Sequence, residues 1–216
     1  MNKKNKEALK KYKTILASSS QSRRGILKEA GLNILSKAPN VDEDALKKTF
    51  KGSPKGLAIM LAEEKALSVS REHKDTLVIG ADQVLSFAGK AYGKPKSLNQ
   101  AKESLRKFKG KTHKLESATA IALNGKIIWR HQDSPALKMR DFSDKFLNLY
   151  IKKAGKKTLL SAGGYSIEKE GAQLFSKIEG DFFTIIGLPL IPLLKKLMVV
   201  IFNSLIKHLK TYTLQT

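Results

Sequence analysis

Three short segments of this sequence place polar side chains where a predicted strand ends. In the first, an apolar strand runs into the hydroxyl-rich residues 18–21, and Arg23 follows at the start of a predicted helix. The free N–H groups of a helix start, with Ser18 and an arginine nearby, favour binding of an anion such as phosphate. A serine at a helix start is also an ordinary cap, so the segment alone indicates either role.

The second segment holds Asp82 directly after the continuous apolar run 76–80, which we predict as a buried strand ending at Gly80. Ligands of open α/β sheets bind at the carboxyl edge of the strands. A carboxylate there is as consistent with a functional role as with a turn cap. The third segment, residues 92–95, presents Lys94 on a turn, where a lysine is ordinarily exposed to solvent.

An acidic cluster at residues 42–44 and the pair Glu64 and Lys65 are further candidates in this basic chain. Acidic clusters are commonly solvated, but hard cations prefer such oxygen ligands. The chain has no cysteine, and its four histidines lack metal-ligand spacing, so a bound metal would be Mg²⁺ or Mn²⁺ on carboxylates. The sequence contains no P-loop, no dinucleotide-binding glycine motif and no nucleophile elbow.

The elements that position these residues alternate between strand and helix. Helical periodicity and end signals predict helices over 22–30, 54–70, 99–109 and 143–154. Apolar runs predict strands over 13–17, 32–38 and 76–80, and Asn124-Gly125 predicts a hairpin joining 114–123 to 126–129. Residues 159–185 read as strand and turn, and a closing helix is expected over 188–197. This alternation predicts an α/β sheet protein.

Charge is the most unusual bulk property of the chain. Its 216 residues include 41 Lys and Arg against 19 Asp and Glu, a formal net charge of +22. We expect weak, salt-sensitive binding to polyanions. Lysine outnumbers arginine 35 to 6 and the aromatic content is 7%, which argues against a dedicated nucleic-acid reader.

The two ends add to the basic excess. Residues 1–13 form a basic N-terminal extension with no visible secretory signal, and a cytoplasmic protein is expected. Residues 182–194 are predicted as a buried strand leading into a terminal helix. The apolar run 197–202 either packs on the body or forms an interfacial helix, and neither run is long enough to span a membrane.

Together these segments resemble the Maf family of nucleoside triphosphate pyrophosphatases, also described as septum-formation inhibitor or house-cleaning proteins. The resemblance covers residues 14–197, which we take as one domain, and leaves 198–216 as a C-terminal extension. The matching segments are 15–20 (ILASSS) with Arg23-Arg24 and 26–27 (IL), 41–43 (VDE), 61–66 (LAEEKA), 80–83 (GADQ), 93–95 (GKP), 110–113 (GKTH), 163–168 (GGYSIE), 178–181 (IEGD) and 187–190 (GLPL).

The resemblance implies a role for each matching site residue. Asp82 aligns with the family's catalytic proton acceptor, and Glu43 together with Asp82 would hold the metal cation. The implied phosphate-binding residues are Ser18, Arg23, Lys65 and Lys94. The positions associated with base selection are Ser22, Gln83 and Glu168. Gln21-Ser22 replaces the family's common Pro-Arg pair. With Gln83 and Glu168, this pattern is unlike the branch of the family that acts on dTTP and UTP and closer to the branch that prefers 7-methyl-GTP, while Ser22 leaves the choice of branch open.

The resemblance further implies a mixed twisted sheet flanked by helices, with two lobes around a central cleft, and a homodimer. The implied reaction is metal-assisted cleavage of a nucleoside triphosphate between its α and β phosphates. The bulk charge leaves an alternative, a non-catalytic basic protein that binds nucleic acid or a cell-division partner. The enzymatic hypothesis requires that Asp82 face a hollow lined by Arg23, Lys65 and Lys94.

Overall fold

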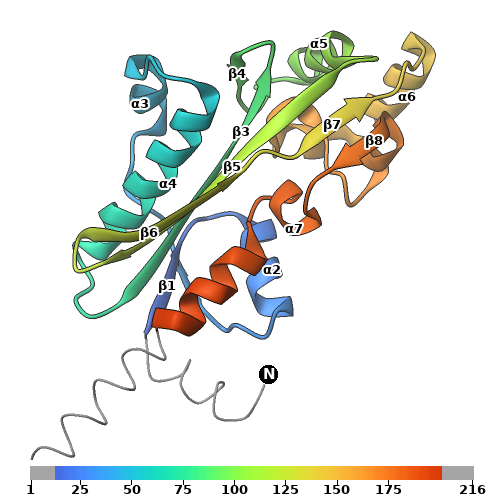
Figure 1. The fold of residues 1–216 in the computed structure, drawn as a ribbon. Coiled ribbons are helices and arrows are strands. Elements are labelled where there is room, and N and C mark those ends of the chain that lie inside the picture. The colour runs from blue at the N-terminus through green and yellow to red at the C-terminus, as the bar shows by residue number, and fades with distance from the viewer. Residues whose placement is uncertain (1–12, 201–216) are drawn as a thin grey trace, which may run out of the picture.

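A mixed β-sheet runs through the whole molecule (Figure 1). The computed structural model describes residues 13–200, so nearly all of the predicted N-terminal extension and most of the C-terminal one lie outside the described residues. The strands, in chain order, are β1 (Thr14–Ala17), β2 (Leu35–Lys37), β3 (Leu77–Phe87), β4 (Lys90–Tyr92), β5 (Thr112–Leu123), β6 (Lys126–Asp133), β7 (Ala136–Met139) and β8 (Phe175–Glu179).

The sheet combines a parallel part and an antiparallel part. Its order is β2-β1-β3-β5-β7-β8, with β4 also paired to β3 and β6 to β5. β1 pairs in parallel with β2 and β3, whereas the remaining pairs are antiparallel. The predicted hairpin is confirmed, and Asn124 and Gly125 adopt the positive φ angles, 50° and 73°, that its tight turn requires. The α/β fold class is therefore confirmed.

Strand β3 departs from its prediction in a way that matters for the site. The sequence predicts a strand that ends at Gly80, but β3 continues to Phe87, so Asp82 lies within a strand and not after one. The strand continues because β5 pairs with it along its length, from Val78 to Ser86. The expectation of a strand end at Gly80 was wrong, because only the parallel neighbour β1 stops there.

On its other edge, β3 has a gap between two partners. The parallel pairing with β1 ends at Gly80, and the antiparallel pairing with β4 begins at Leu85. Among the described strands, none pairs with this edge of β3 over residues 81–84. We call this stretch the β3 window. The segments that follow β1 and β4, which carry Ser18 and Lys94, lie at its two ends.

Helix α4 (Pro54–Ser70) covers one face of the sheet, and its predicted bounds are confirmed. Ser53 caps its first turn by accepting a hydrogen bond from the N–H of Gly56, and Pro54 fits the first helical position. The helix packs on the small residues of β3 and β5, and a Cβ added at Gly80 would lie 2.1 Å from the Ala62 carbonyl oxygen. Only glycine permits this close approach.

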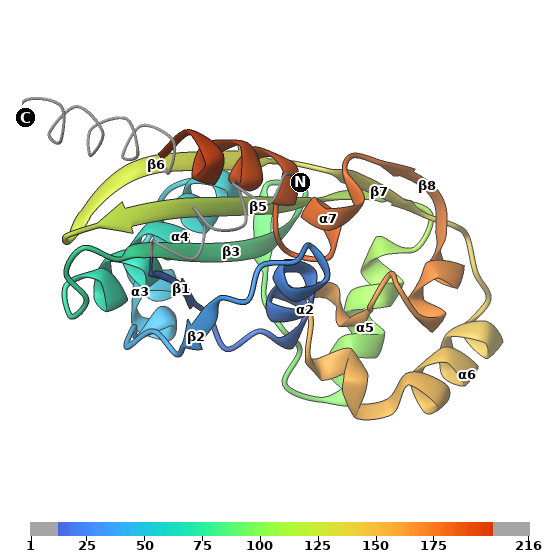
Figure 2. The same ribbon diagram turned by 90° about the horizontal axis from the view of Figure 1, so that it is seen from below.

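The opposite face is covered by α2 (Gln21–Glu29), α7 (Phe182–Ile185) and the helical residues 190–200 (Figure 2). The far end of the sheet carries a separate apolar cluster, to which α5 (Leu98–Phe108) and α6 (Asp144–Ala154) contribute. Strands β3 and β5 extend through both ends (Figure 1), so the molecule has two lobes sharing one sheet. The central cleft between them stays a prediction.

Several local predictions were incomplete or wrong. The predicted strand at 182 is instead the one-turn helix α7, because Asp181 caps it and Gly187 ends it. Residues 155–174 form the short 3₁₀ segments η1 (Gly155–Leu159), η2 (Ala162–Gly164) and η3 (Glu170–Leu174) before β8. Helix α3 (Glu43–Thr49) and strands β4 and β7 had no sequence prediction. Within residues 13–200, none of the helices is long and apolar enough to cross a membrane.

Candidate active site

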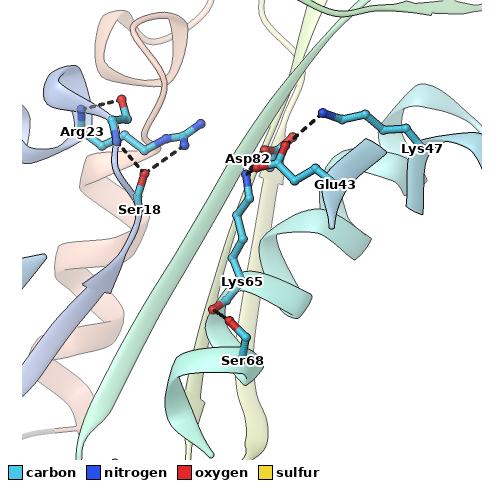
Figure 3. Close-up of polar contacts among 8 residues, drawn as sticks. Ser18, Arg23, Glu43, Lys47, Lys65, Ser68 and Asp82 are labelled. Atoms are coloured by element: carbon cyan, nitrogen blue, oxygen red, sulfur yellow. Dashed lines mark hydrogen bonds and ion pairs between the residues drawn. The ribbon is translucent and has the colours of Figure 1, made fainter. Parts of the chain in front are cut away.

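Two carboxylates from different elements converge on one lysine. The Lys65 ammonium lies 2.6 Å from Oδ1 of Asp82 and 2.8 Å from Oε1 of Glu43 (Figure 3). The Lys65 and Asp82 side chains are 7% and 10% exposed, so their pairing is nearly shielded from water, whereas Glu43 is 36% exposed. The cluster therefore lies at the border between the core and solvent, with Glu43 on its exposed side.

The close approach of α4 to the sheet explains why Lys65 reaches Asp82. Ala62 and Ala66 lie against Gly80, and Lys65, next to them on the helix, is brought beside the strand. Side chains alternate along β3, so Asp82 shares the face of Gly80 and of Val84, which packs against the α4 cluster. Asp82 and Lys65 are therefore placed by the helix–sheet packing.

Helix α3 delivers the second carboxylate. Asp42 caps this helix by accepting a hydrogen bond from the N–H of Ala45 at 2.9 Å, so Glu43 is its first residue. Burial would raise the pKa of Glu43, but the hydrogen bonds and charges of Lys65 and Lys47 outweigh it and lower the pKa to about 2. Glu43 is therefore a permanent carboxylate at neutral pH.

The loop after β1 forms a second polar group. Ser20 caps α2, and the buried Ser18 hydroxyl accepts a hydrogen bond from the Ser20 N–H at 3.2 Å and another from Nη1 of Arg23 at 3.4 Å. The predicted strand–loop–helix arrangement is thus confirmed. Burial lowers the pKa of Arg23 and outweighs the charges of Asp82 and Glu43, which act in the opposite direction.

Helix α7 and the turn after it hold both Arg23 and Gln83. The Arg23 Nε donates to the Gly187 carbonyl at 2.8 Å. On β3, the Gln83 amide donates to the carbonyls of Thr184 and Ile185 at 2.9 and 3.2 Å. Gln83 points to the face opposite Asp82, because neighbouring residues of a strand alternate. The acceptors are Gly187, the first residue of the GLPL motif, and two residues of α7, which lies between that motif and IEGD.

The other predicted site residues lie further from the cluster. Ser22 is exposed in the first turn of α2, Lys94 is exposed after β4, and Glu168 is exposed in the turn before η3. Among the contacts of the described residues, no hydrogen bond or ion pair joins these side chains to Asp82, Glu43 or Lys65. Figure 3 likewise shows Ser18 and Arg23 standing apart from the carboxylates. A ligand that used all of these residues would have to bridge them.

The two carboxylates suit a hard divalent cation in one specific way. Asp82 and Glu43 contact the same ammonium nitrogen, so their carboxylates lie close enough together for one cation to contact both. Within the described part of the chain, no group of three or more His, Asp or Glu side chains could hold a metal ion. Magnesium is commonly held by one or two carboxylates together with substrate phosphates. The donor set fits a cation that binds with a phosphate ligand.

The expected hollow between Arg23, Lys65 and Lys94 stays a prediction. A pocket of about 400 Å³ lies elsewhere, at the C-terminal end of α4, and is lined by Ser70, Arg71, Lys74, Asp75, Asn124 and Gly125. Their polar groups are partly engaged with one another, as the Asn124 side chain accepts from the Asp75 N–H at 2.8 Å. None of the predicted site residues lines this pocket.

One residue of the cluster was not predicted. Lys47 lies one helical turn after Glu43, and its ammonium is 2.9 Å from Oε2 of Glu43. The spacing Glu-x-x-x-Lys favours such a pair on a helix, but the signal requires that α3 be recognised first. The carbonyls of Thr184, Ile185 and Gly187 were also missed, because backbone acceptors leave no mark in the sequence.

The fold and site define a mixed α/β protein in which a capped helix start, with Ser18 and Arg23, and a cluster of two carboxylates and a lysine lie along the same sheet. Sequence comparison makes this class specific: the family described as Maf-like protein matches residues 13–200. The chain is 44% identical over 186 residues to a 7-methyl-GTP pyrophosphatase of Rhizobium meliloti, covering 85% of this chain and 94% of the relative. The chain belongs to the Maf family.

Two further relatives carry related names. A nucleoside triphosphate pyrophosphatase of Caulobacter vibrioides is 47% identical over 182 residues, which cover 83% of this chain and 91% of the relative. A 7-methyl-GTP pyrophosphatase of Bartonella henselae is 46% identical over 184 residues, with coverage of 85% and 93%. Each alignment spans nearly the whole relative, so the similarity concerns the complete domain.

Proposed function

We propose that this protein is a hydrolase that cleaves nucleoside triphosphates between the α and β phosphates, giving a monophosphate and pyrophosphate. The observation that carries the proposal is the convergence of Asp82 and Glu43 on Lys65 at the β3 window, with the Ser18 and Arg23 loop at one end of that window. Relatives named as pyrophosphatases over most of their length support it.

In this proposal Asp82 accepts the proton of the attacking water. The 2.6 Å contact with Lys65 holds the Asp82 carboxylate in place at the β3 window, and a positioned carboxylate can serve as a general base. Arg23, Lys65 and Lys94 neutralise phosphate charge, while the Ser18 hydroxyl and the first N–H groups of α2 hold phosphate oxygens. A divalent cation held by Asp82 and Glu43 would polarise the phosphate and stabilise the pyrophosphate that leaves.

We further propose a guanine nucleotide, methylated at N7, as the preferred substrate. Glu168 is exposed in a turn, and a carboxylate there can accept hydrogen bonds from the exocyclic amine and ring N–H of guanine. It would also favour the positive charge of the methylated ring. The relatives named as 7-methyl-GTP pyrophosphatases support this finer assignment.

The test of the activity is a panel of normal and modified nucleoside triphosphates with Mg²⁺ or Mn²⁺, with pyrophosphate as the product measured. We expect Asp82→Asn to lower turnover by about 10²–10⁴, the range for loss of a general base. The matched control is Asp141→Asn, because Asp141 is 82% exposed and pairs only at the surface with Lys109. A near-normal rate in Asp82→Asn would remove the assigned role.

The test of the substrate compares kcat/KM for 7-methyl-GTP with that for GTP. Glu168→Gln should reduce the preference for the methylated ring by about tenfold, the size of one charge-assisted contact. Glu170→Gln, two residues along, is the control. An unchanged ratio would show that another residue reads the base. If no triphosphate gives pyrophosphate and DNA binds with strong salt dependence, the non-catalytic alternative gains support.

A further inference from the structure

Lys47 contacts Glu43, one of the two carboxylates that would hold the proposed cation. Glu43 offers Oε1 to Lys65 at 2.8 Å and Oε2 to Lys47 at 2.9 Å, so both of its oxygens are engaged with ammonium groups. Figure 3 shows Lys47 reaching from α3 toward the same carboxylates that Lys65 meets from α4. The cluster is thus a chain of alternating charges, Lys47–Glu43–Lys65–Asp82.

The two lysines differ in how firmly they are held. The Lys65 side chain is 7% exposed and contacts two carboxylates, whereas the Lys47 side chain is 39% exposed and has Glu43 as its described partner. Removing Lys65 would leave nearly buried charges without compensation. Lys47 can leave Glu43 at little cost, because exposed ion pairs of this spacing are weak and lysine keeps its charge in water.

We propose that Lys47 is a displaceable counter-cation: it holds Glu43 in the nucleotide-free protein and competes there with the divalent cation. This positioning role for Lys47 rests on the proposed function, in which Glu43 and Asp82 hold that cation. Two carboxylates that are already neutralised by two lysines attract a free divalent cation weakly. A cation brought by a triphosphate has additional ligands on the phosphates, so it can replace Lys47 on Glu43.

The neighbouring residue provides a matched control. Lys48 stands next to Lys47 on α3, is also exposed, and makes no ion pair among the described residues. Lys47→Met and Lys48→Met remove the same charge from the same short helix. Any general effect of net charge on metal binding therefore appears in both variants, and only the specific contact with Glu43 differs. Lys47→Arg keeps the charge and serves as the conservative variant.

The experiment is a titration of the nucleotide-free protein with Mn²⁺ at low ionic strength, followed by the paramagnetic signal of the free ion. We expect Lys47→Met to bind Mn²⁺ about two- to fivefold more tightly than wild type, the size of one exposed ion pair. Lys48→Met and Lys47→Arg should stay close to wild type. In the activity assay, the Mg²⁺ concentration for half-maximal rate should fall in Lys47→Met alone.

Equal affinities in Lys47→Met and Lys48→Met would overturn the proposal, and so would weaker binding in Lys47→Met, which would mean that Lys47 orients Glu43 for the metal. Absence of Mn²⁺ binding in all variants would overturn it as well. None of these results depends on turnover. Failure of the pyrophosphatase assay would instead concern the proposed function, so the two failures can be told apart.

Discussion

Strands β3 and β5 each contribute to a buried polar group, and the two groups differ in charge. At the β3 window, Lys65, Asp82 and Glu43 are charged and compensate one another. Toward the other end of the sheet, His113 on β5 is 2.6 Å from the Tyr165 hydroxyl, inside the aromatic and apolar surroundings of the second lobe. Burial lowers the pKa of His113 to about 4 and raises the pKa of Tyr165, so this pair is neutral at pH 7.

The two groups differ in their access to water. The charged group includes Glu43, whose side chain is 36% exposed. The neutral pair is shut off, and Nδ1 of His113 has no hydrogen-bond partner within the described residues. The packing around His113 and Tyr165 stabilises this pair, and their hydrogen bond ties the loop that contains Tyr165 to strand β5. The same loop leads to Glu168, three residues further along.

The largest effect should come from breaking the charged group. Lys65→Met leaves Asp82 nearly buried without its cation, and we expect the free energy of unfolding to fall by about 3–5 kcal/mol. Urea unfolding monitored by circular dichroism measures this change. Lys37→Met is the control, because Lys37 forms an exposed pair with Glu72 and should cost less than about 1 kcal/mol. Similar losses in both variants would contradict the comparison.

The neutral pair should reveal itself through pH. In the folded protein His113 takes up a proton only near pH 4, whereas an unfolded histidine does so near pH 6.5. The free energy of unfolding therefore keeps its full value above about pH 6.5. As the pH falls from 6.5 to 4, it decreases by about 3 kcal/mol, because the unfolded chain binds the proton first. Urea unfolding across this range should show the loss in wild type and not in His113→Phe. The same slope in both proteins would mean that His113 is not the group responsible.

Glu43 should give a smaller effect in a lower pH window. Its pKa of about 2 in the folded protein lies below the value of about 4.3 expected when unfolded. Its contribution is present above about pH 4.3 and is lost as the pH falls to 2. Because the side chain is more than a third exposed, we expect about 1 kcal/mol. The stability difference between wild type and Glu43→Gln should shrink over this window, and a constant difference would contradict the assignment.

Short-range signals predicted much of this structure. Helix α4 was predicted with its correct bounds, because a serine cap, a proline at the first position and apolar spacing all act within a few residues. The hairpin at Asn124-Gly125 is fixed by the backbone angles of two residues. Helix α3 was not predicted, because it has no buried residue and therefore no apolar periodicity. The acidic residues at its start, which cap the helix, were interpreted as an acidic cluster instead.

By itself, the sequence determined the starts of α2, α4, α5 and α6 to within one residue, the hairpin and the family, because caps, turns and ordered motifs are local or additive along the chain. Only the tertiary structure decided that β3 runs past Gly80, since its length depends on pairing with β5. It alone brought Glu43 and Asp82 to the same lysine, and placed Arg23 and Gln83 on the carbonyls around α7. These contacts join residues far apart in the chain, and their geometry follows from packing that no local pattern records.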